Sequence, residues 1–321
     1  MVGYQEWVDF QSGLDTRQKA NVINNFNVTN SNPGNVYWVI HSSKAFYQDF
    51  YDTHQVQYSD GSWAVHPDAG TGDGIAAAIA ACKGGRNDSV LVMPGSYQLT
   101  AALTMAGKSS VHLIAVNGGG CEVGTVGAVL LQQTGNFACV IMESYGELSG
   151  FQLINKAGYP AVTAATGIWR PNIHNNYFHM VQGTACNIIA GTGSGFSHGF
   201  ICNNKFQTWV GGSITTAINI ATTATGVTIS NNHILNYSGT MDTGISVNDA
   251  KQCLISDNII SDCGGAGTIT VGIYMAAATG NILVGNRMGL PTGTAISGGT
   301  ADKSFVQNFD AEDGGATAIE T

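Results

Sequence analysis

The segment ISNNHI at residues 229–234 belongs to a set of six similar segments spread over the second half of the chain. The set comprises IHNNYF from Ile173, ICNNKF from Ile201, ISNNHI from Ile229, ISDNII from Ile255, LVGNRM from Leu283 and FVQNFD from Phe305. The Asn in fourth position recurs after 28, 28, 26, 28 and 22 residues. A period of this length predicts stacked repeats. Because long helix-forming stretches are absent, we expect each repeat to be one coil of a parallel β-helix.

A second short apolar segment lies about thirteen residues before each of these Asn positions. These segments are AVTA from Ala161, AINIA from Ala217, GISVN from Gly244, GIYMA from Gly272 and AISGG from Ala295. Their alternation of Ile or Val with Ser, Thr or Asn predicts two strands per repeat, each with one buried face. The repeat that carries Ala185–Ile189 is four residues too long, so we interpret GTGSGFSHG at residues 191–199 as an extruded loop.

The repeated Asn has a structural interpretation. Side-chain amides at one turn position of successive coils can bond to each other and to backbone groups that the turn leaves unpaired. A buried polar row persists only if every member is satisfied. We therefore predict an internal ladder, not a binding site, made of Asn176, Asn204, Asn232, Asn258, Asn286 and Asn308.

Three segments nearer the N-terminus resemble the pectin-lyase-like right-handed β-helices. They are GDGIAAAIAACKGGRNDSVLVMPGSYQL from Gly72, VHLIAV from Val111 and LSGFQLIN from Leu148. The resemblance implies an all-β, single-stranded, right-handed parallel β-helix, with a short helix closing one end. It specifies fold and leaves function open. The expected domains are an N-terminal arm at 1–65, a β-helix at 66–310 with its capping helix at 73–83, and an acidic tail at 311–321.

The capping helix also follows from the residues. Asp73 is a good N-cap residue, and Gly84 and Gly85 end the segment. The apolar residues Ile75, Ala78, Ile79 and Cys82 share one helical face. Covering the end of the stack hides its core and its strand edges, which prevents open-ended association.

The composition argues against several kinds of partner, location and site. The net charge of −9, without a basic run, argues against nucleic acid as a partner. No apolar run reaches 18 residues and the start lacks a signal-peptide pattern, so we expect no membrane insertion and no Sec export. Seven cysteines without CxxC indicate buried thiols in a protein made in a reducing cytoplasm. The scattered His residues predict no metal site, and we expect no cofactor.

The first 65 residues contain twelve of the 28 aromatic residues. This density suggests an arm that docks on another protein, with Trp7, Phe10, Tyr37 and Trp38 as candidate contacts. The alternative is that these aromatic side chains cover the flank of the solenoid.

Catalytic candidates are few. Polysaccharide hydrolases need paired carboxylates, and lyases need a cation with an Arg or Lys base. The best candidates are Asp242, Asp249, Asp257 and Asp262, for which turn chemistry is the stronger interpretation. A glycan-binding module would instead use exposed rings such as Trp169, Trp209 and Tyr237.

The pattern GNVYWV, HPDAGTGDGIAAAI and VLVMPGSYQLT, read from Gly34 to Thr100, is similar to β-helical proteins of tailed bacteriophages. That resemblance implies an anchor segment and association as a homotrimer. Only 10% of the residues are charged, which favours burial of part of the surface between subunits. We expect a structural virion protein, made in the host cytoplasm and attached to capsid or tail proteins as decoration or spike. The alternative is a tailspike that binds or cleaves a cell-surface glycan.

Overall fold

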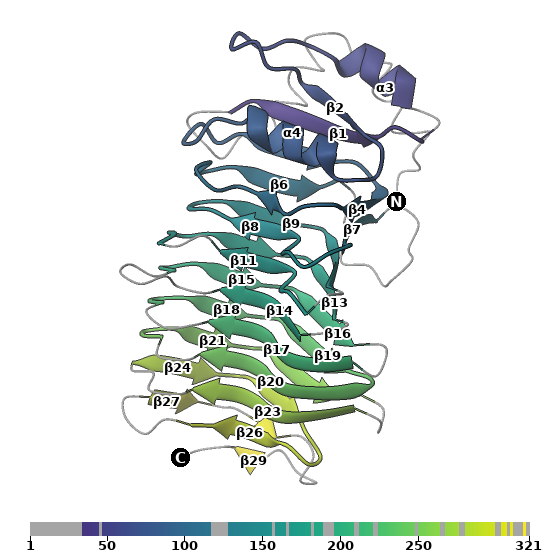
Figure 1. Ribbon diagram of the computed structural model, residues 1–321. Helices are drawn as coiled ribbons and strands as arrows, with labels where there is room; N and C mark the ends of the chain where they lie inside the picture. The colour runs from purple at the N-terminus through teal and green to yellow at the C-terminus, as the bar shows by residue number, and fades with distance from the viewer. Residues whose placement is uncertain are drawn as a thin grey trace, which may run out of the picture.

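The computed structural model describes residues 34–44, 47–116, 128–155, 158–164, 167–180, 183–188, 196–208, 212–220, 224–247, 250–263, 267–275, 280–298, 303–306, 309–310 and 317–318. Nearly all of its regular structure is β-strand, arranged in three sheets that run the length of the molecule (Figure 1).

Sheet 1 has eleven strands. In spatial order they are β2 (Val65–Asp68), β1 (Val36–His41), β3 (Ser89–Val92), β6 (His112–Ala115), β9 (Glu147–Ser149), β12 (Asn172–His174), β15 (Phe200–Cys202), β18 (Thr228–Ser230), β21 (Leu254–Ser256), β24 (Asn281–Val284) and β27 (Lys303–Val306).

Sheet 2 has ten strands. They are β4 (Gly95–Leu99), β7 (Val129–Gln133), β10 (Gln152–Asn155), β13 (Tyr177–Met180), β16 (Lys205–Thr208), β19 (His233–Asn236), β22 (Ile259–Asp262), β25 (Arg287–Gly289), β28 (Phe309–Asp310) and β29 (Thr317–Ala318).

Sheet 3 has eight strands. They are β5 (Leu103–Thr104), β8 (Val140–Met142), β11 (Val162–Ala164), β14 (Gly183–Ile188), β17 (Gly212–Ile220), β20 (Gly239–Val247), β23 (Gly267–Met275) and β26 (Thr294–Ser297).

From β3 to β28 the chain visits the three sheets in rotation, so that each strand from β6 to β25 pairs with the third strand before it and the third after it. These pairs are parallel, and the antiparallel pair β28–β29 follows them. The result is an all-β stack of coils, compatible with a parallel β-helix. Each coil has three strands where the sequence predicted two, because the repeated segment such as Ile173–Phe178 bends at Asn175 and Asn176 and supplies strands to both sheet 1 and sheet 2.

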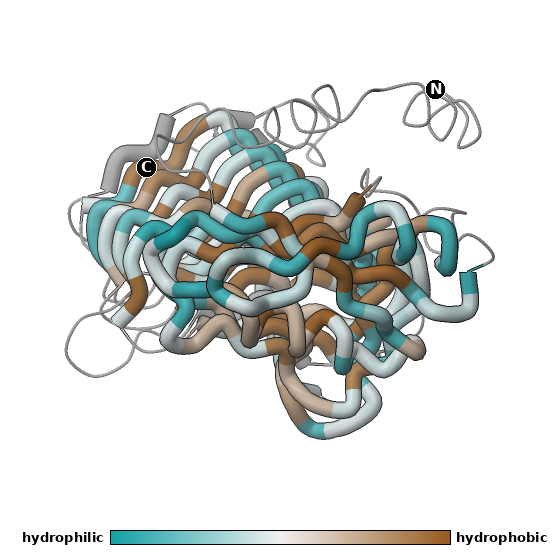
Figure 2. Tube along the Cα trace, turned by 90° about the horizontal axis from the view of Figure 1, so that it is seen from above, coloured by the Kyte–Doolittle hydropathy of each residue, from teal (hydrophilic) through white to brown (hydrophobic). Residues whose placement is uncertain are grey.

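The core is a set of apolar columns inside the coils. In sheet 1 the central residue of each short strand is fully buried, and these residues lie in register along the stack. The column consists of Leu148, Ile173, Ile201, Ile229, Ile255 and Leu283. In sheet 2 the rings of Phe178 and Phe206 stack at 4.4 Å in the equivalent position. Figure 2, viewed along the stack, shows hydrophobic positions following one another from coil to coil.

Helix α4 (Asp73–Ala81) covers the N-terminal end of the core, as the sequence predicted. Ile75, Ala78 and Ile79 are buried against it. The capping residue is different from the expected one: Gly72 is the N-cap, and no side chain caps the helix from that position. The carboxylate of Asp68, in the strand before the helix, accepts the backbone N–H groups of Gly70, Thr71, Gly72, Gly74 and Ile75 at 2.7–3.3 Å.

The predicted arm does not form a separate segment where the structure describes it. Strand β1 lies between β2 and β3 in sheet 1. Residues 36–41 therefore belong to the same sheet as the strands that follow residue 65 in the chain. Helix α3 (Tyr47–His54) packs over the outer face of this end, where Phe50 contacts the ring of Trp38. The described part of 1–65 therefore covers the end of the stack.

The turns between sheets 1 and 2 repeat one unusual backbone conformation. Asn175, Asn203, Asn231, Asp257 and Gly285 all have positive φ, between 53° and 68°. Asn, Asp and Gly are the residues that tolerate this left-handed region. The position of Asp257 in this series therefore follows from turn geometry.

Candidate functional site

The repeated Asn side chains form a continuous hydrogen-bonded column inside the stack. Each of the four members from Asn176 to Asn258 donates through Nδ2 to the Oδ1 of the next at 2.9–3.2 Å, and its backbone N–H donates to the same oxygen. Each Nδ2 also donates to a backbone carbonyl of the preceding coil. The described members are Asn176, Asn204, Asn232, Asn258 and Asn286, all at most 2% exposed. Asn308 lies outside the described residues.

The Asn column leaves little capacity for a ligand. In Asn232, Oδ1 accepts two N–H groups and Nδ2 donates twice. The backbone N–H of Phe151 extends the column by one coil, since it donates to Oδ1 of Asn176. The column therefore holds coils together and presents nothing to solvent.

The structure does not gather the candidate carboxylates into one site. Asp242 is exposed on β20 of sheet 3, and Asp257 is exposed in the turn between sheets 1 and 2. Asp262 lies at the end of β22 in sheet 2. No hydrogen bond joins any two of these three, and Asp249 is outside the described residues. These three Asp residues thus come from different elements of the stack, whereas glycoside hydrolysis requires two carboxylates that flank one bond.

Asp262 has a structural role of its own. Its carboxylate accepts the backbone N–H of Ile269 at 3.1 Å and the side-chain amide of Asn236 at 3.5 Å. The hydroxyl of Thr208 donates to Oδ1 of Asn236, which makes a second short column through three coils. Burial raises the pKa of Asp262, and the two hydrogen bonds oppose that rise. Asp262 is therefore a turn-stabilising residue.

Two of the four candidate docking residues are described. Tyr37 is fully buried, and its hydroxyl is bonded to Ser62, Arg86 and the carbonyl of Ala81. Trp38 packs partly buried against Phe50. Tyr37 is therefore not available to a partner. It agrees with the alternative interpretation, in which these aromatic side chains pack against the flank of the solenoid. Trp7 and Phe10 lie outside the described residues.

Two of the three aromatic candidates for glycan binding are also among the described residues. Trp169 and Tyr237 are exposed at 46% and 37% respectively, while Trp209 is outside the described residues. Two further rings near Trp169 were not predicted: Tyr145 is 49% exposed and Phe200 is 44% exposed.

Sequence reasoning also missed an ionisable cluster on the outer face of sheet 1. Glu147 on β9 contacts Nδ1 of His112 on β6 at 2.7 Å and Nε2 of His174 on β12 at 2.9 Å. The hydroxyl of Ser149 also donates to Glu147, at 3.2 Å. Burial opposes ionisation of Glu147, but the hydrogen bonds from the two His residues outweigh it and hold the pKa of Glu147 well below its usual range. The cluster joins three successive coils.

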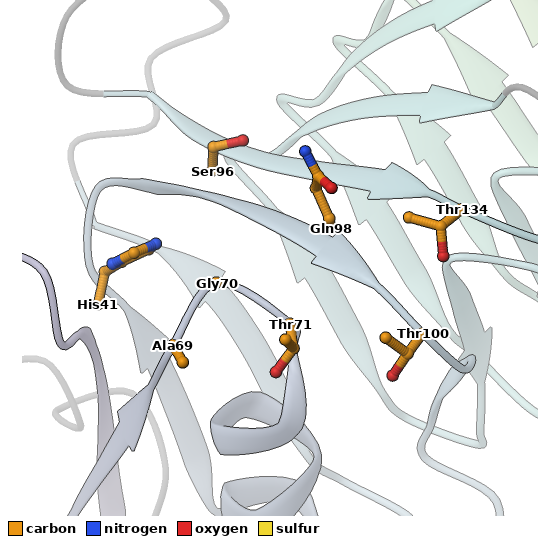
Figure 3. Close-up of a pocket in the computed structure, with 8 residues that line it drawn as sticks. All are labelled: His41, Ala69, Gly70, Thr71, Ser96, Gln98, Thr100 and Thr134. Atoms are coloured by element: carbon orange, nitrogen blue, oxygen red, sulfur yellow. The ribbon is translucent and has the colours of Figure 1, made fainter.

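An open polar hollow of about 460 Å³ lies near the start of α4 (Figure 3). Its lining comes from the end of β1, the segment before α4, and the ends of β4 and β7. The residues are His41, Ala69, Gly70, Thr71, Ser96, Gln98, Thr100 and Thr134. The lining includes no carboxylate and no Lys or Arg, and the adjacent helix N-terminus is already occupied by the carboxylate of Asp68. The hollow offers hydroxyl and amide groups and the imidazole of His41, whose Nδ1 lies 2.8 Å from the hydroxyl oxygen of Ser43.

The described thiols are mostly inert. Cys82, Cys139 and Cys253 are buried, and burial raises the pKa of Cys82 and Cys139 to about 12 and that of Cys253 to about 11. In the part of the chain that the structure describes, no group of three or more His, Cys, Asp or Glu side chains is arranged to hold a metal ion. No helix among the described residues has the length and apolar character needed to cross a membrane.

Comparison with known proteins gives no relative: no protein-family model, no curated protein and no solved structure matches this chain.

Proposed function

We propose that this chain is a structural protein of a bacteriophage particle. In this proposal the chain folds as a single right-handed parallel β-helix of the pectin-lyase-like kind. It attaches either to the capsid, as decoration, or to the tail, as a spike. The right-handed sense follows the general chirality of parallel crossover connections.

The observation that carries the proposal is the Asn column. Five successive coils are joined inside by side-chain amides as well as by backbone pairing. Such a stack resists local opening, because separating two coils leaves several buried polar groups unpaired. Mechanical and proteolytic resistance is what a particle surface demands. The assignment to a bacteriophage rests on the resemblance from Gly34 to Thr100.

The test is quantitative mass spectrometry of gradient-purified particles, with the copy number of this chain compared with that of the major shell protein. Many copies per shell would support capsid decoration, and a handful would support a tail or vertex spike. Absence of the chain from purified particles would refute the proposal.

The proposed assembly is a homotrimer. The low proportion of charged residues and an exposed apolar side chain on sheet 1, Ile282, favour association between copies. Multi-angle light scattering should give about three times the chain mass of 33.4 kDa at micromolar concentration. A stable mass of one chain would contradict the trimer.

A second candidate function is action on a cell-surface polysaccharide. The separated Asp residues do not favour it, but the cluster of Glu147, His112 and His174 supplies one carboxylate fixed by two imidazoles on an outer face. General acid and base catalysis uses such groups. If the protein cleaves a polysaccharide, Glu147→Gln should abolish the fall in viscosity of the polymer solution, whereas Asp242→Asn should leave it unchanged.

A further inference from the structure

One exposed edge of the stack combines aromatic and basic side chains. It follows the turns that lead from sheet 3 into sheet 1. We call it the aromatic–basic edge and define it as Tyr145, Trp169, Arg170, His198, Phe200 and Lys251. The rings of Tyr145, Trp169 and Phe200 are 44–49% exposed, which is unusual for side chains of this size in a well-packed protein.

Backbone pairing aligns these residues along the axis of the stack. Trp169 pairs with Ser197, Ser197 with Thr225 and Thr225 with Lys251. The N–H of Tyr145 donates to the carbonyl of Trp169 at 2.6 Å. Neighbouring coils are therefore one strand spacing apart, about 4.8 Å, and the edge is a continuous surface across five coils.

Two of the ring systems are held in place before any partner arrives. The rings of Trp169 and His198 are 5.7 Å apart. On its other side the His198 ring lies over Gly226, where an added Cβ would come within 2.5 Å of Nδ1. Side chains that are already ordered lose less conformational entropy on binding.

The charge of the edge is opposite to that of the chain, whose net charge is −9. Arg170 and Lys251 are exposed, and neither forms an ion pair with a described residue. No carboxylate occupies the turn positions 144–145, 169–170, 197–198, 225–226 and 251–252. Two nearby carboxylates are bonded within the chain: Glu143, in the turn of Tyr145, accepts the N–H groups of Gly107 and Ser144, and Glu147 is bonded to His112 and His174.

We propose that the aromatic–basic edge is the docking surface for an acidic patch on another virion protein, an inference that rests on the proposed function. Trp, Tyr and Arg are the residue types that dominate binding energy at protein interfaces. Unpaired cations select an acidic partner surface by charge complementarity and disfavour contact with the same edge of another copy. The docking surface thus lies on the side of the stack, formed by turns of the described coils.

The experiment measures binding of the purified full-length protein to particle shells from which this chain has been stripped, by co-sedimentation over a range of protein concentrations. Trp169→Ala should weaken binding roughly tenfold or more. Arg170→Glu should weaken it and reduce its dependence on salt. The matched control is Tyr274→Ala, because the ring of Tyr274 is 37% exposed on sheet 3 and is not one of the residues of the edge. This variant should bind within about twofold of the wild type. Circular dichroism and thermal melting verify that each variant is folded.

Three outcomes overturn the inference, and they differ from one another. If the wild type binds shells and both edge variants bind equally well, the edge is not the docking surface while the proposed function stands. If the wild type does not bind shells at all, the proposed function and the inference both fail. If the edge variants keep shell binding but lose binding to host-cell envelope fragments, the edge is a glycan-binding site.

Discussion

Asn232 and its neighbour Asn231 show how the same residue type serves two opposite purposes. Asn232 is fully buried and bonds to the coils on both sides, while Asn231 is exposed with a φ of 53°. The first position uses the hydrogen-bonding capacity of the amide. The second uses the tolerance of Asn for the left-handed backbone region.

Replacement of Asn232 should therefore be costly and replacement of Asn231 should not. Asn232→Ala removes the donor to the carbonyl of Ile201, the shared acceptor of the backbone N–H and side-chain amide of Asn204, and one of the two donors to Oδ1 of Asn258. We expect a loss of unfolding free energy on the order of 3 kcal/mol in urea titrations. Asn231→Gly should change it by less than about 1 kcal/mol, since Gly accepts positive φ. Equal losses for the two variants would contradict the internal role of the column.

Glu147 should make stability depend on pH. Its pKa in the folded protein lies below its ordinary value of 4.5, so it contributes stability that is present above that value and is lost as the pH falls. Wild type should exceed Glu147→Gln in unfolding free energy at pH 7, by on the order of 1 kcal/mol. The difference should shrink below about pH 4.5, and a difference that grows in acid would refute this assignment.

At the scale of the element, helix α4 depends on a carboxylate outside the helix. Asp68 is 1% exposed and accepts five backbone N–H groups around the helix start, whereas Asp73 in the first turn receives only the hydroxyl of Thr71 from the described residues. An anion at this position also interacts favourably with the helix dipole. The cap of the stack is therefore fixed by the strand that precedes it.

Asp68→Ala and Asp73→Ala should differ sharply. Loss of the Asp68 carboxylate leaves several N–H groups unpaired in a buried place, so we expect a destabilisation of several kcal/mol, about 3 or more. Hydrogen exchange should accelerate in α4 and in β3, and the uncovered end should promote aggregation seen by light scattering. Asp73→Ala should cost less than about 1 kcal/mol. Similar exchange rates in the two variants would show that Asp68 is not the capping group.

A second polar network ties the cap to β1. Arg86 binds Asp88 through two nitrogens at 2.6 and 2.7 Å and reaches the hydroxyl of Tyr37 at 2.8 Å. The hydrogen bonds from Arg86 and Ser62 hold the pKa of the exposed Asp60 below its usual range. Because β1 is locked to the cap in this way, the segment around Tyr37 is part of the folded body.

At the scale of the whole molecule, the bonds between β1 and the cap determine how truncation at the N-terminus should affect the melting temperature. Residues 34–65 supply β1, α3 and two of the partners of Arg86, Tyr37 and Asp60. A chain that starts at residue 34 keeps these contacts and should melt at a clearly higher temperature than one that starts at residue 66. A chain that starts at residue 66 should expose β3 and α4 and should aggregate or melt at clearly lower temperature. Equal melting temperatures for the two truncations would contradict the integration of β1 into the body.

Sequence alone determined the repeat and its chemistry. The spacing of Asn176 to Asn286, the inward Ile positions and the Asn, Asp and Gly turn residues all express local rules, in which period, propensity and turn geometry act within one coil. The capping helix and its apolar face also follow from rules that act between residues close together in the chain. These features needed no knowledge of which coil lies beside which.

Only the tertiary structure decided which side chains meet. His112, Glu147 and His174 are separated by 35 and 27 residues, and the early coils follow no fixed period, so the sequence carried no sign that three coils bring them together. For the same reason Asp68 was missed as the cap, and the sequence left open whether Tyr37 docks on a partner or packs against the flank. Contacts between coils depend on loop lengths and on hydrogen-bond register, which are properties of the assembled stack.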